Sequence, residues 1–480
     1  MHSVSPKTKQ TGDYVAREVT GDKIDFSVGQ PSPESLPLAA LSQAAAHRLG
    51  SPDAELLLQY GPRQGYLSFR QSLAAFLTKR YGTAVDAAHL MVTAGVSHGL
   101  GLAVGALARP GDVVAVECPT YFLVPPIFRD HHLRLVPLRT DDHGLDVEAL
   151  AAWLAADTSH RPRFVYTIPI HNNPRGTTLP AARRRRLLAL AAQYDFLVLA
   201  DEVYQLLSFP EKPSPTAAAV EQQQQAQGGG PAASNARQDA WARPEEGIAI
   251  GPQGASAHEP LPLPLRCYED LRGEAGSGSD GGGDTSTSGT EGSGGSGGGG
   301  NSSRVLSFGS FSKMLAPALR LGWIECSNPA LLSRLKEDGV ISSGGCIAQM
   351  SAGLAHSALE LGLQDAHLDG VVAPGLARRC AALCTALRRH LPECRLQQPR
   401  GGYFVWLEFP QEVSAKALLV RAEARHGVRF TPGPACGGGG EHCARLSFAF
   451  YTEQELEEGA RRLGEALREH MAQEQPAMAP

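Results

Sequence analysis

Short apolar runs alternate with amphipathic stretches over most of the 480-residue chain. The segment FLVLADEVY, residues 196–204, is almost entirely apolar until two acids, which is the pattern of a strand covered on both faces. DVVAVECPTY (112–121) and FVYTIPI (164–170) have the same strand pattern, while 62–82 and 181–195 have helical spacing. This alternation predicts an α/β fold with a mostly parallel, helix-covered sheet. In such a sheet, ligands bind at the carboxyl ends of the strands.

The chain after about residue 330 has a different pattern, which predicts a second, smaller domain. Helical stretches come first, and then the strands GGYFVWLEF (401–409) and ARLSFAF (444–450) precede an amphipathic helix at 453–471. This order indicates an α+β domain. We therefore expect an N-terminal arm, a large domain and a small C-terminal domain, at residues 1–44, 45–325 and 326–480.

A low-complexity stretch, residues 211–304, interrupts the predicted large domain. It contains QQQQ and the run GSGSDGGGDTSTSGTEGSGGSGGGGNSS. Such a composition buries too little apolar surface to offset its ordering entropy, so we predict a largely disordered insertion. Its apolar part, LPLPLRCYEDL (261–271), is compatible with an ordered fragment. The alternative is a regulatory or docking loop.

Composition and charge disfavour several classes of protein. The 44 basic and 49 acidic residues give a net charge of −5, so nothing favours nucleic acid or an anionic membrane as a partner. No run of 18 apolar residues exists, and the N-terminus has no apolar signal core. The nine cysteines lack a CxxC pair and indicate free thiols in a reducing compartment. We expect a cytoplasmic protein, with import into an organelle left open.

The arginine run 183–186 is interpreted as the solvated face of a helix.

The segment Ser307–Arg320, SFGSFSKMLAPALR, carries the candidate chemistry. A lysine that forms an imine with an aldehyde must be partly unprotonated and fixed in place. Lys313 could supply that amine, Ser310 and Ser312 could donate hydrogen bonds to a neighbouring phosphate, and Arg320 could neutralise it. The alternative is an exposed lysine in a serine-rich loop. Of the eight lysines, however, only Lys313 is bracketed by hydroxyls and flanked by apolar strands.

With this segment, the sequence resembles the fold-type I pyridoxal-phosphate (PLP) aminotransferases, in particular the branch with 2-aminoadipate, kynurenine and multi-substrate aminotransferases. The resemblance covers about 22–210 and 304–470, and several motifs occur in the family's order. It implies that Lys313 is the Schiff-base lysine. It also implies that the two serines and the arginine of the same segment bind the cofactor phosphate.

The turn TAGVSH opens a predicted helix, and its free N–H groups suit an anion. The resemblance implies that Gly95, Val96 and Ser97 cradle the phosphate, although the family often has glutamine where this chain has Ser97 and His98. Tyr121, in CPTYF, matches the aromatic residue that stacks on the cofactor ring. Without the resemblance, a core tyrosine would be the favoured interpretation.

Three further positions match family residues that contact the cofactor ring. An Asn-Pro turn in PIHNNPRG presents Asn173, which would bind the phenolic oxygen and the substrate, with the adjacent Asn172 as the alternative. Asp201 ends the most apolar strand, where a carboxylate is costly unless it pairs with a cation such as a protonated ring nitrogen. Tyr204 matches a second ligand of the phenolic oxygen. The alternative is that Asp201 or Glu202 only caps the segment after the strand.

Substrate and subunit contacts are also implied by the resemblance. Arg445, at the head of ARLSFAF, matches the arginine that binds the substrate α-carboxylate, and its planar fork suits that group. Gly29, in SVGQPSP, matches the glycine of an N-terminal arm that closes over the substrate. Tyr60 precedes a Gly-Pro turn and matches a tyrosine that reaches across a homodimer interface to the phosphate. The alternatives are a surface arginine and a tyrosine that packs on its own subunit.

The sequence therefore predicts a PLP-dependent aminotransferase that moves an amino group from an L-amino acid to a 2-oxo acid, with Lys313 as general base and acid. Aminoadipate, aromatic and branched-chain donors are all compatible, and no metal is expected. Two alternatives stay open. One is another PLP reaction on the same residues, by a carbon–sulfur lyase or a cyclopropane-forming synthase. The other is a non-catalytic PLP-binding regulator, for whose DNA-binding domain the roughly 20 residues before the arm are too few.

Overall fold

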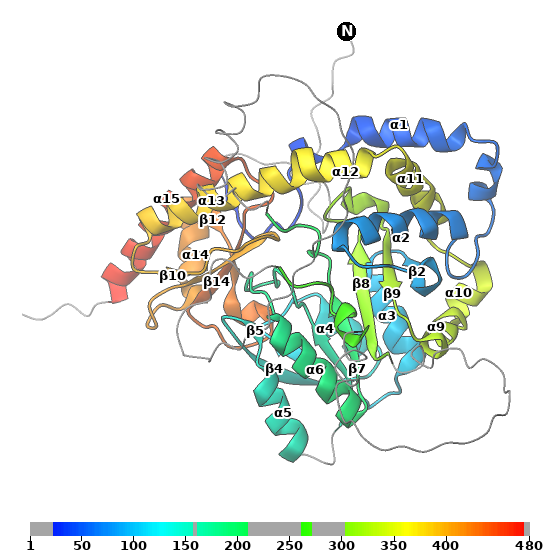
Figure 1. Cartoon of the computed structure of the whole chain (residues 1–480). Helices are drawn as coiled ribbons and strands as arrows, with labels where there is room; N and C mark the ends of the chain where they lie inside the picture. The colour runs from blue at the N-terminus through cyan, green and yellow to red at the C-terminus, as the bar shows by residue number, and fades with distance from the viewer. Residues whose placement is uncertain (1–22, 157–160, 210–260, 271–302, 475–480) are drawn as a thin grey trace, which may run out of the picture. The chain divides into compact units, whose positions relative to one another are not determined.

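The structure is a computed structural model, and it describes residues 23–156, 161–209, 261–270 and 303–474 (Figure 1). All of these except Leu261 belong to one compact unit. The predicted insertion lies outside the described residues, apart from 261–270 and its last two positions. The first 22 residues of the predicted arm also lie outside them.

An eight-stranded sheet forms the centre of the larger part of the fold (Figure 1). In sheet order, its strands are β2 (Leu90–Thr93), β9 (Gly322–Glu325), β8 (Val305–Ser310), β7 (Leu197–Asp201), β6 (Pro162–Thr167), β3 (Val113–Cys118), β4 (Arg134–Asp141) and β5 (Gly144–Leu145). In this described sheet only β9 and β5 run against the other strands. The predicted, mostly parallel α/β sheet is confirmed, and the three apolar runs are β3, β6 and β7.

Helices cover both faces of this sheet. Successive residues of each strand point to opposite faces, so their core contacts show which helices lie on which face. On β3, Val114 and Val116 belong to one core with residues of α2, α3 and α4, while Ala115 belongs to a second core with residues of α5 and α6. These helices are α2 (Leu67–Tyr81), α3 (Val96–Leu107), α4 (Val124–Asp130), α5 (Val147–Ala156) and α6 (Ala181–Tyr194). With both faces covered, a ligand reaches the sheet at the ends of its strands.

A four-stranded antiparallel sheet forms the centre of the C-terminal part, which confirms the predicted smaller α+β domain. Its strands are β10 (Arg395–Leu396), β11 (Phe404–Glu408), β14 (Cys443–Ser447) and β13 (Thr431–Pro432). Its long helix α15 (Glu453–Glu474) packs against α13 (Ala373–His390) and α14 (Ala415–His426). The N-terminal strand β1 (Ile24–Asp25) pairs in parallel with β12 (Val428–Arg429), so the C-terminal part holds the start of the described chain. The domain boundaries stay a prediction.

The other helices lie mainly around the larger sheet. They are α1 (Leu38–Leu49), α8 (Cys267–Asp270), α9 (Pro329–Lys336), α10 (Gly339–Gly344), α11 (Gln349–Glu360) and α12 (Leu363–His367), with short 3-10 helices at Pro33–Ser35, Ala54–Leu58, Ala87–His89, Pro317–Leu319 and Gly433–Cys436. A π-helical turn, Leu368–Val372, joins α12 to α13. The combined helix is long and apolar enough to cross a membrane by length and composition, but half of its most apolar stretch is buried inside the protein, like the core helix of a globular domain.

Arg184 corrects the interpretation of the arginine run on α6, because its side chain is fully buried. Its guanidinium donates to the carbonyl oxygens of Leu179 (2.8 Å), Leu263 (2.9 Å) and Pro169 (2.6 Å), and it lies 3.6 Å from a carboxylate oxygen of Glu202. A buried cation is tolerated when its donors are satisfied in this way. The bonds tie the segment 262–270 to the loop that follows β6.

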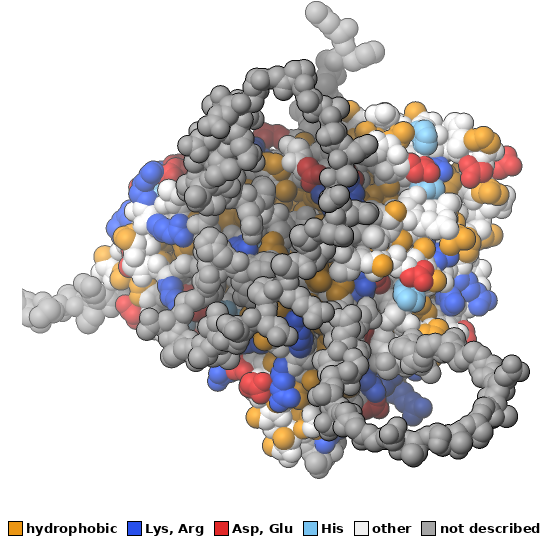
Figure 2. Space-filling view, in the orientation of Figure 1, with side chains coloured by type: hydrophobic (Ala, Val, Ile, Leu, Met, Phe, Trp, Pro, Cys, Tyr) orange, Lys and Arg blue, Asp and Glu red, His pale blue; other side chains and the backbone are white. Residues whose placement is uncertain are grey.

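The described surface carries charges of both signs (Figure 2), and the cysteines are unpaired. On the face shown in Figure 2, acidic and basic side chains are intermingled wherever described residues are visible. The whole chain has 44 basic and 49 acidic residues, so neither sign is in large excess. All nine cysteines are described, and all are free.

Candidate active site

Lys313 lies in the turn that follows β8. Its Nζ donates a 2.6 Å hydrogen bond to the carbonyl oxygen of Gly29 and lies 4.9 Å from the centre of the Tyr403 ring. The Tyr403 hydroxyl donates to the carbonyl oxygen of Lys313 (3.0 Å), which fixes the turn. Burial and the positive charge of Arg445 lower the pKa of Lys313 to about 8, although the Asp201 carboxylate acts in the opposite direction. A larger share of the amine is therefore neutral near physiological pH, as a nucleophile or base requires.

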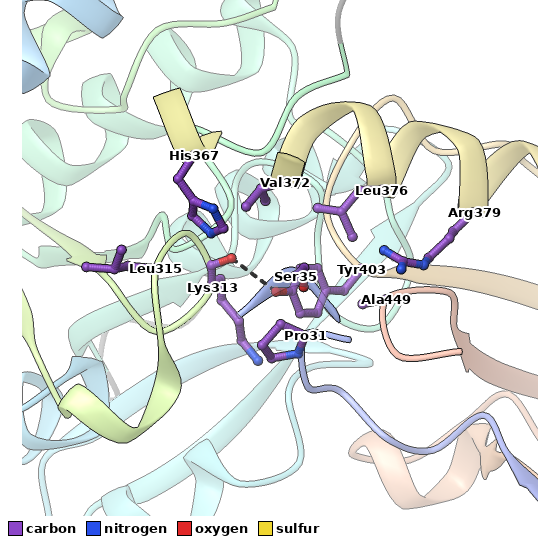
Figure 3. A pocket seen from close by; sticks show the side chains of 10 residues that line it. All are labelled: Pro31, Ser35, Lys313, Leu315, His367, Val372, Leu376, Arg379, Tyr403 and Ala449. Carbon is purple, nitrogen blue, oxygen red and sulfur yellow. Dashed lines mark hydrogen bonds between the residues drawn. The ribbon is translucent and has the colours of Figure 1, made fainter. Parts of the chain in front are cut away.

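A pocket lies beside this lysine (Figure 3). It is lined by Pro31 and Ser35 of the N-terminal segment, by Lys313 and Tyr403, and by side chains of α12 and α13, among them Arg379. Figure 3 shows the Lys313 amine next to Pro31. Together with the hydrogen bond from Nζ, this contact means that the N-terminal segment covers the amine.

Asp201 is the last residue of β7 and is only 4% exposed. Its Oδ2 accepts a 2.8 Å hydrogen bond from the Tyr166 hydroxyl, while Oδ1 is buried without a partner among the described residues. Burial raises the pKa of this carboxyl to about 6, although the Tyr166 bond acts to lower it. An unsatisfied buried carboxylate oxygen is costly. The position therefore suits a cationic N–H donor, as a protonated pyridine ring would provide.

Arg445 lies on β14 and is 2% exposed. Its Nη1 donates to Oδ1 of Asn173 (3.1 Å), and its Nη2 donates to the carbonyl oxygen of Ser27 (2.8 Å) and to Oγ1 of Thr431 (3.1 Å). The ring of Phe404 lies 4.3 Å from the guanidinium carbon. All three hydrogen-bond partners are neutral oxygens, so the cation keeps its attraction for a carboxylate. Asn173 and Arg445, both predicted to bind substrate, are thus in direct contact.

Gly95 opens α3, and Val96 and Ser97 are the first residues of that helix. Gly95 has φ +83°, and a Cβ on it would lie 2.9 Å from Nη2 of Arg320. The positive φ favours glycine here, and the absence of a Cβ lets the guanidinium approach the helix start closely. Free N–H groups at a helix N-terminus, faced by a guanidinium, form an anion site.

Two serines lie beside this helix start. Ser310 pairs with Gly322 on β9, and a Cβ on Gly322 would lie 3.0 Å from Cα of Gly95. The Ser310 hydroxyl donates to the carbonyl oxygen of Leu321 (3.2 Å) and accepts from the backbone N–H of Ser312 (3.0 Å). The structure thus brings the residues predicted to bind phosphate to one place.

Tyr204 and Tyr121 lie in the same site. Tyr204 is 3% exposed, and its ring packs on that of Tyr403 with centroids 5.8 Å apart. Burial raises the pKa of Tyr204 well above its usual value, and the nearby Tyr121 and Asp201 raise it further, while Arg445 acts to lower it. The Tyr121 ring packs on that of Phe122 with centroids 5.6 Å apart, and the Phe122 ring lies 5.2 Å from the guanidinium carbon of Arg445. The residues predicted to contact the cofactor ring therefore lie near the arginine predicted to bind the substrate.

Tyr60 lies apart from the other predicted site residues in the described chain. It is 88% exposed, and its ring lies beside Gly344 of α10, since a Cβ on that glycine would be 3.8 Å from the ring. Within one subunit its side chain is therefore a surface feature. Its predicted role requires a second subunit.

Sequence reasoning missed Glu117, Tyr166 and Tyr403. Glu117 is buried and accepts a hydrogen bond from the side-chain amide of Asn172 (2.9 Å), so Asn172 contacts Glu117 while Asn173 contacts Arg445. A carboxylate inside the apolar run VVAVEC was a signal for the glutamate. The two tyrosines lie in apolar strand patterns that give no such signal.

Comparisons with known proteins agree with this geometry. A family model described as aminotransferase class I and II matches residues 21–229 and 294–463. The aromatic-amino-acid aminotransferase 1 of Thermococcus litoralis is 28% identical, with 94% of this chain and 89% of that protein covered. The 2-aminoadipate transaminase of Thermus thermophilus is also 28% identical, with 93% and 90% covered.

Solved structures show the same relationship. The multiple substrate aminotransferase from Thermococcus profundus has a TM-score of 0.72 and 26% identity, with 95% of this chain and 93% of that chain covered. The α-aminoadipate aminotransferase from Thermus thermophilus, complexed with N-(5′-phosphopyridoxyl)-L-leucine, has a TM-score of 0.67 and 27% identity, with 94% and 93% covered.

Proposed function

The chain belongs to the aminotransferase class I and II family, and we propose that this PLP-dependent transaminase uses aminoadipate, aromatic or branched-chain L-amino acids as donors and a 2-oxo acid as acceptor. The observation that carries the chemistry is the juxtaposition of two buried groups. Lys313 has a lowered pKa, and Asp201 keeps an unsatisfied oxygen for a cationic ring. We also propose a cytoplasmic location, which the free cysteines support.

The residues present fit PLP. Lys313 would hold the cofactor, Asp201 its ring nitrogen, and Asn173 and Tyr204 its phenolic oxygen, with Tyr121 against the ring. The phosphate would lie among Gly95, Val96, Ser97, Ser310, Ser312 and Arg320. When bound, PLP supplies an electron sink for the charge left when a proton leaves the substrate Cα.

The chain's own residues would then bind and orient the amino acid. The guanidinium of Arg445 binds the α-carboxylate through two parallel hydrogen bonds, which fixes the orientation of Cα. Nζ of Lys313 would take the proton from the substrate Cα and deliver it to the cofactor's C4′ carbon, and a pKa near 8 is close to the operating pH that such transfer favours. The N-terminal segment, with Gly29 at the amine, excludes water.

The proposed donor classes rest on the walls beside Arg445. The rings of Phe404 and Phe122 lie 4.3 and 5.2 Å from its guanidinium carbon, and aromatic walls accommodate long apolar or aromatic side chains. The relatives named for aromatic and 2-aminoadipate substrates support the same classes.

A donor screen tests this proposal. Purified enzyme is mixed with each L-amino acid with and without 2-oxoglutarate, and the 2-oxo acid product and glutamate are measured. We expect equal amounts of both products, only with acceptor, from at least one of the three donor classes. Turnover by Lys313→Ala should be lower by roughly 10²-fold or more. Release of a 2-oxo acid and a thiol from a thioether amino acid without acceptor would indicate a lyase instead.

We also propose a homodimer. Large apolar side chains are exposed on two neighbouring segments, at Leu56, Leu58, Tyr60, Val340 and Ile347. The segments touch, since a Cβ on Gly61 would meet the side chain of Gln349. A continuous exposed apolar surface of this kind marks an interaction site. Tyr60 would then reach the phosphate of the partner's site.

A further inference from the structure

We propose that Glu117 is a positioning residue of this active site, which holds Asn173 in place through Asn172. The inference rests on the proposed function, since it concerns how a predicted cofactor and substrate ligand is held. Glu117 is a buried charge that takes no direct part in the chemistry proposed for Lys313, Asp201 and Arg445.

Glu117 is an unusual residue for its place. It lies on β3, the strand that ends just before the turn with Tyr121, and is 2% exposed. Its Oε1 accepts from the Thr167 hydroxyl (2.5 Å), and its Oε2 accepts from the backbone N–H of Ile168 (3.0 Å) and from Nδ2 of Asn172 (2.9 Å). All three donors are neutral, and among the described residues no lysine or arginine forms an ion pair with this carboxylate. A buried carboxylate without a counter-ion is costly, and burial accordingly raises its pKa to about 7.

The three hydrogen bonds hold the loop after β6 at its start and at its turn. Thr167 and Ile168 are where the chain leaves β6, and Asn172 is four residues further on, so one carboxylate fixes the start and the turn of this loop. Asn172 is held further because its N–H donates to the carbonyl oxygen of Thr177 (2.8 Å). Its Oδ1 also accepts from the N–H of Arg175 (3.1 Å).

Asn173 is the next residue, and its orientation follows from this hold. Its Oδ1 accepts from Nη1 of Arg445 (3.1 Å), so its Nδ2 donors point elsewhere, as a ligand of the cofactor's phenolic oxygen requires. Glu117 thus connects, through two adjacent asparagines, to the arginine proposed to bind the α-carboxylate. Without Glu117 the loop would lose three of the hydrogen bonds that hold it.

Two variants distinguish a positioning role of the Glu117 carboxylate from the effect of filling its buried site. Glu117→Leu keeps the approximate volume and removes every acceptor. Glu117→Gln keeps the shape, and its amide oxygen can accept from Ile168 and Asn172 while its NH₂ donates to Thr167. The control is Glu325→Leu. Glu325 is another buried carboxylate, which lies on β9 and not in the loop after β6, and it pairs with Arg266 (2.5 Å).

The main readout is the pH midpoint of the visible band of the lysine-bound cofactor, measured by absorbance on the PLP-loaded enzyme. A donor to the phenolic oxygen draws negative charge away from the imine proton, so loss of that donor makes the proton harder to remove. We expect Glu117→Leu to raise the midpoint by about one pH unit, a tenfold change. We expect KM for the amino donor to rise roughly tenfold, because Asn173 also orients Arg445. Glu117→Gln should restore both values to within about twofold, or 0.3 pH units.

Two results would contradict the positioning role of Glu117. If Glu117→Leu is folded and leaves both values unchanged, or if Glu325→Leu shifts them as much, the positioning role is wrong. If Glu117→Leu is insoluble, Asn172→Ala cuts the same link and must give the same upward shift, and an unchanged midpoint overturns the proposal. Failure of the proposed function is distinguishable, since it would appear as absence of transamination by the unaltered enzyme.

Discussion

At the scale of single residues, Asp201 shows what burial costs a carboxylate whose partner is supplied from outside. Burial raises its pKa from about 3.8 to about 6, so the folded protein without PLP holds this proton more tightly than the unfolded chain does. This group's contribution to stability is therefore lost as pH rises from about 4 through 6. A cationic ring nitrogen beside Oδ1 reverses that cost.

We therefore expect the thermal stabilisation by added PLP to be larger at pH 7.5 than at pH 5. Thermal melts with and without PLP over this range measure it. PLP's own phosphate titrates nearby, so Asp201→Asn serves as the control, in which the extra gain at high pH should shrink to the part that the phosphate contributes. Equal gains at both pH values in the unaltered enzyme would contradict the assignment of Asp201.

Lys313 gives a second prediction at this scale. Lys313→Ala removes the amine that holds PLP and moves the proton, so the visible cofactor band should be absent and turnover should fall by roughly 10²–10⁴-fold or more. Borohydride treatment of the unaltered enzyme should fix the cofactor on the peptide that contains Lys313, as mass spectrometry would detect. A Lys313→Ala protein that transaminates at a comparable rate would rule out the central assignment.

Residues differ in how far the sequence alone predicts them. Lys313 and Asp201 could be predicted because their neighbours in the chain, hydroxyls for one and an apolar strand for the other, already define their environment. The burial of Arg184 could not be predicted, since the carbonyls that satisfy it include that of Leu263, far along the chain. Glu117 was missed for the same reason, because the residues that bind it lie about 50 positions away.

At the scale of elements, the apolar runs were sufficient to predict β3, β6 and β7, because a strand buried on both faces needs no partner to be recognised. The pairing of β1 with β12 gave no signal, since each strand has only two residues. The segment 262–270 is an intermediate case. It was compatible with order, and the structure buries its Leu265 and Tyr268 in the core beneath α6.

This difference within the predicted insertion leads to a third prediction. Deletion of Pro213–Pro260 and Gly276–Gly300 should leave the melting temperature within about 2 °C and activity within about twofold, because loop-closure entropy varies only logarithmically with length. A longer deletion that also removes 262–270 is the matched control. It removes one buried backbone partner each from Arg184 and Glu202, which costs about 1–3 kcal/mol of unfolding free energy for each group. An insoluble first variant would show that the deleted parts pack on the catalytic unit.

At the scale of the whole molecule, the proposed homodimer explains why Tyr60 is exposed in one subunit. Mixing Tyr60→Ala chains with Lys313→Ala chains tests whether sites are shared. If Tyr60 acts across the interface, each hybrid dimer has one site with an intact Lys313 from one chain and an intact Tyr60 from the other. Activity should then reappear, with one working site per hybrid.

The two variants must each be nearly inactive alone, and hybrid formation is verified by differently tagged chains. If Tyr60 instead serves its own subunit, both sites of the hybrid stay defective and no activity returns. That result would leave Tyr60 as a surface residue and would remove the main support for shared sites.

The pairing of β1 with β12 also has a consequence for biosynthesis. The ribosome synthesises Ile24 and Ser27 early, whereas their neighbours Val428 and Arg445 emerge roughly 400 residues later. At roughly 5–20 residues per second, the nascent N-terminal segment waits about 20–80 s for the strand that receives it. The large sheet can assemble during that interval, but the amine of Lys313 stays uncovered until translation is almost complete. The chain thus acquires a closed catalytic centre only at the end of its own synthesis.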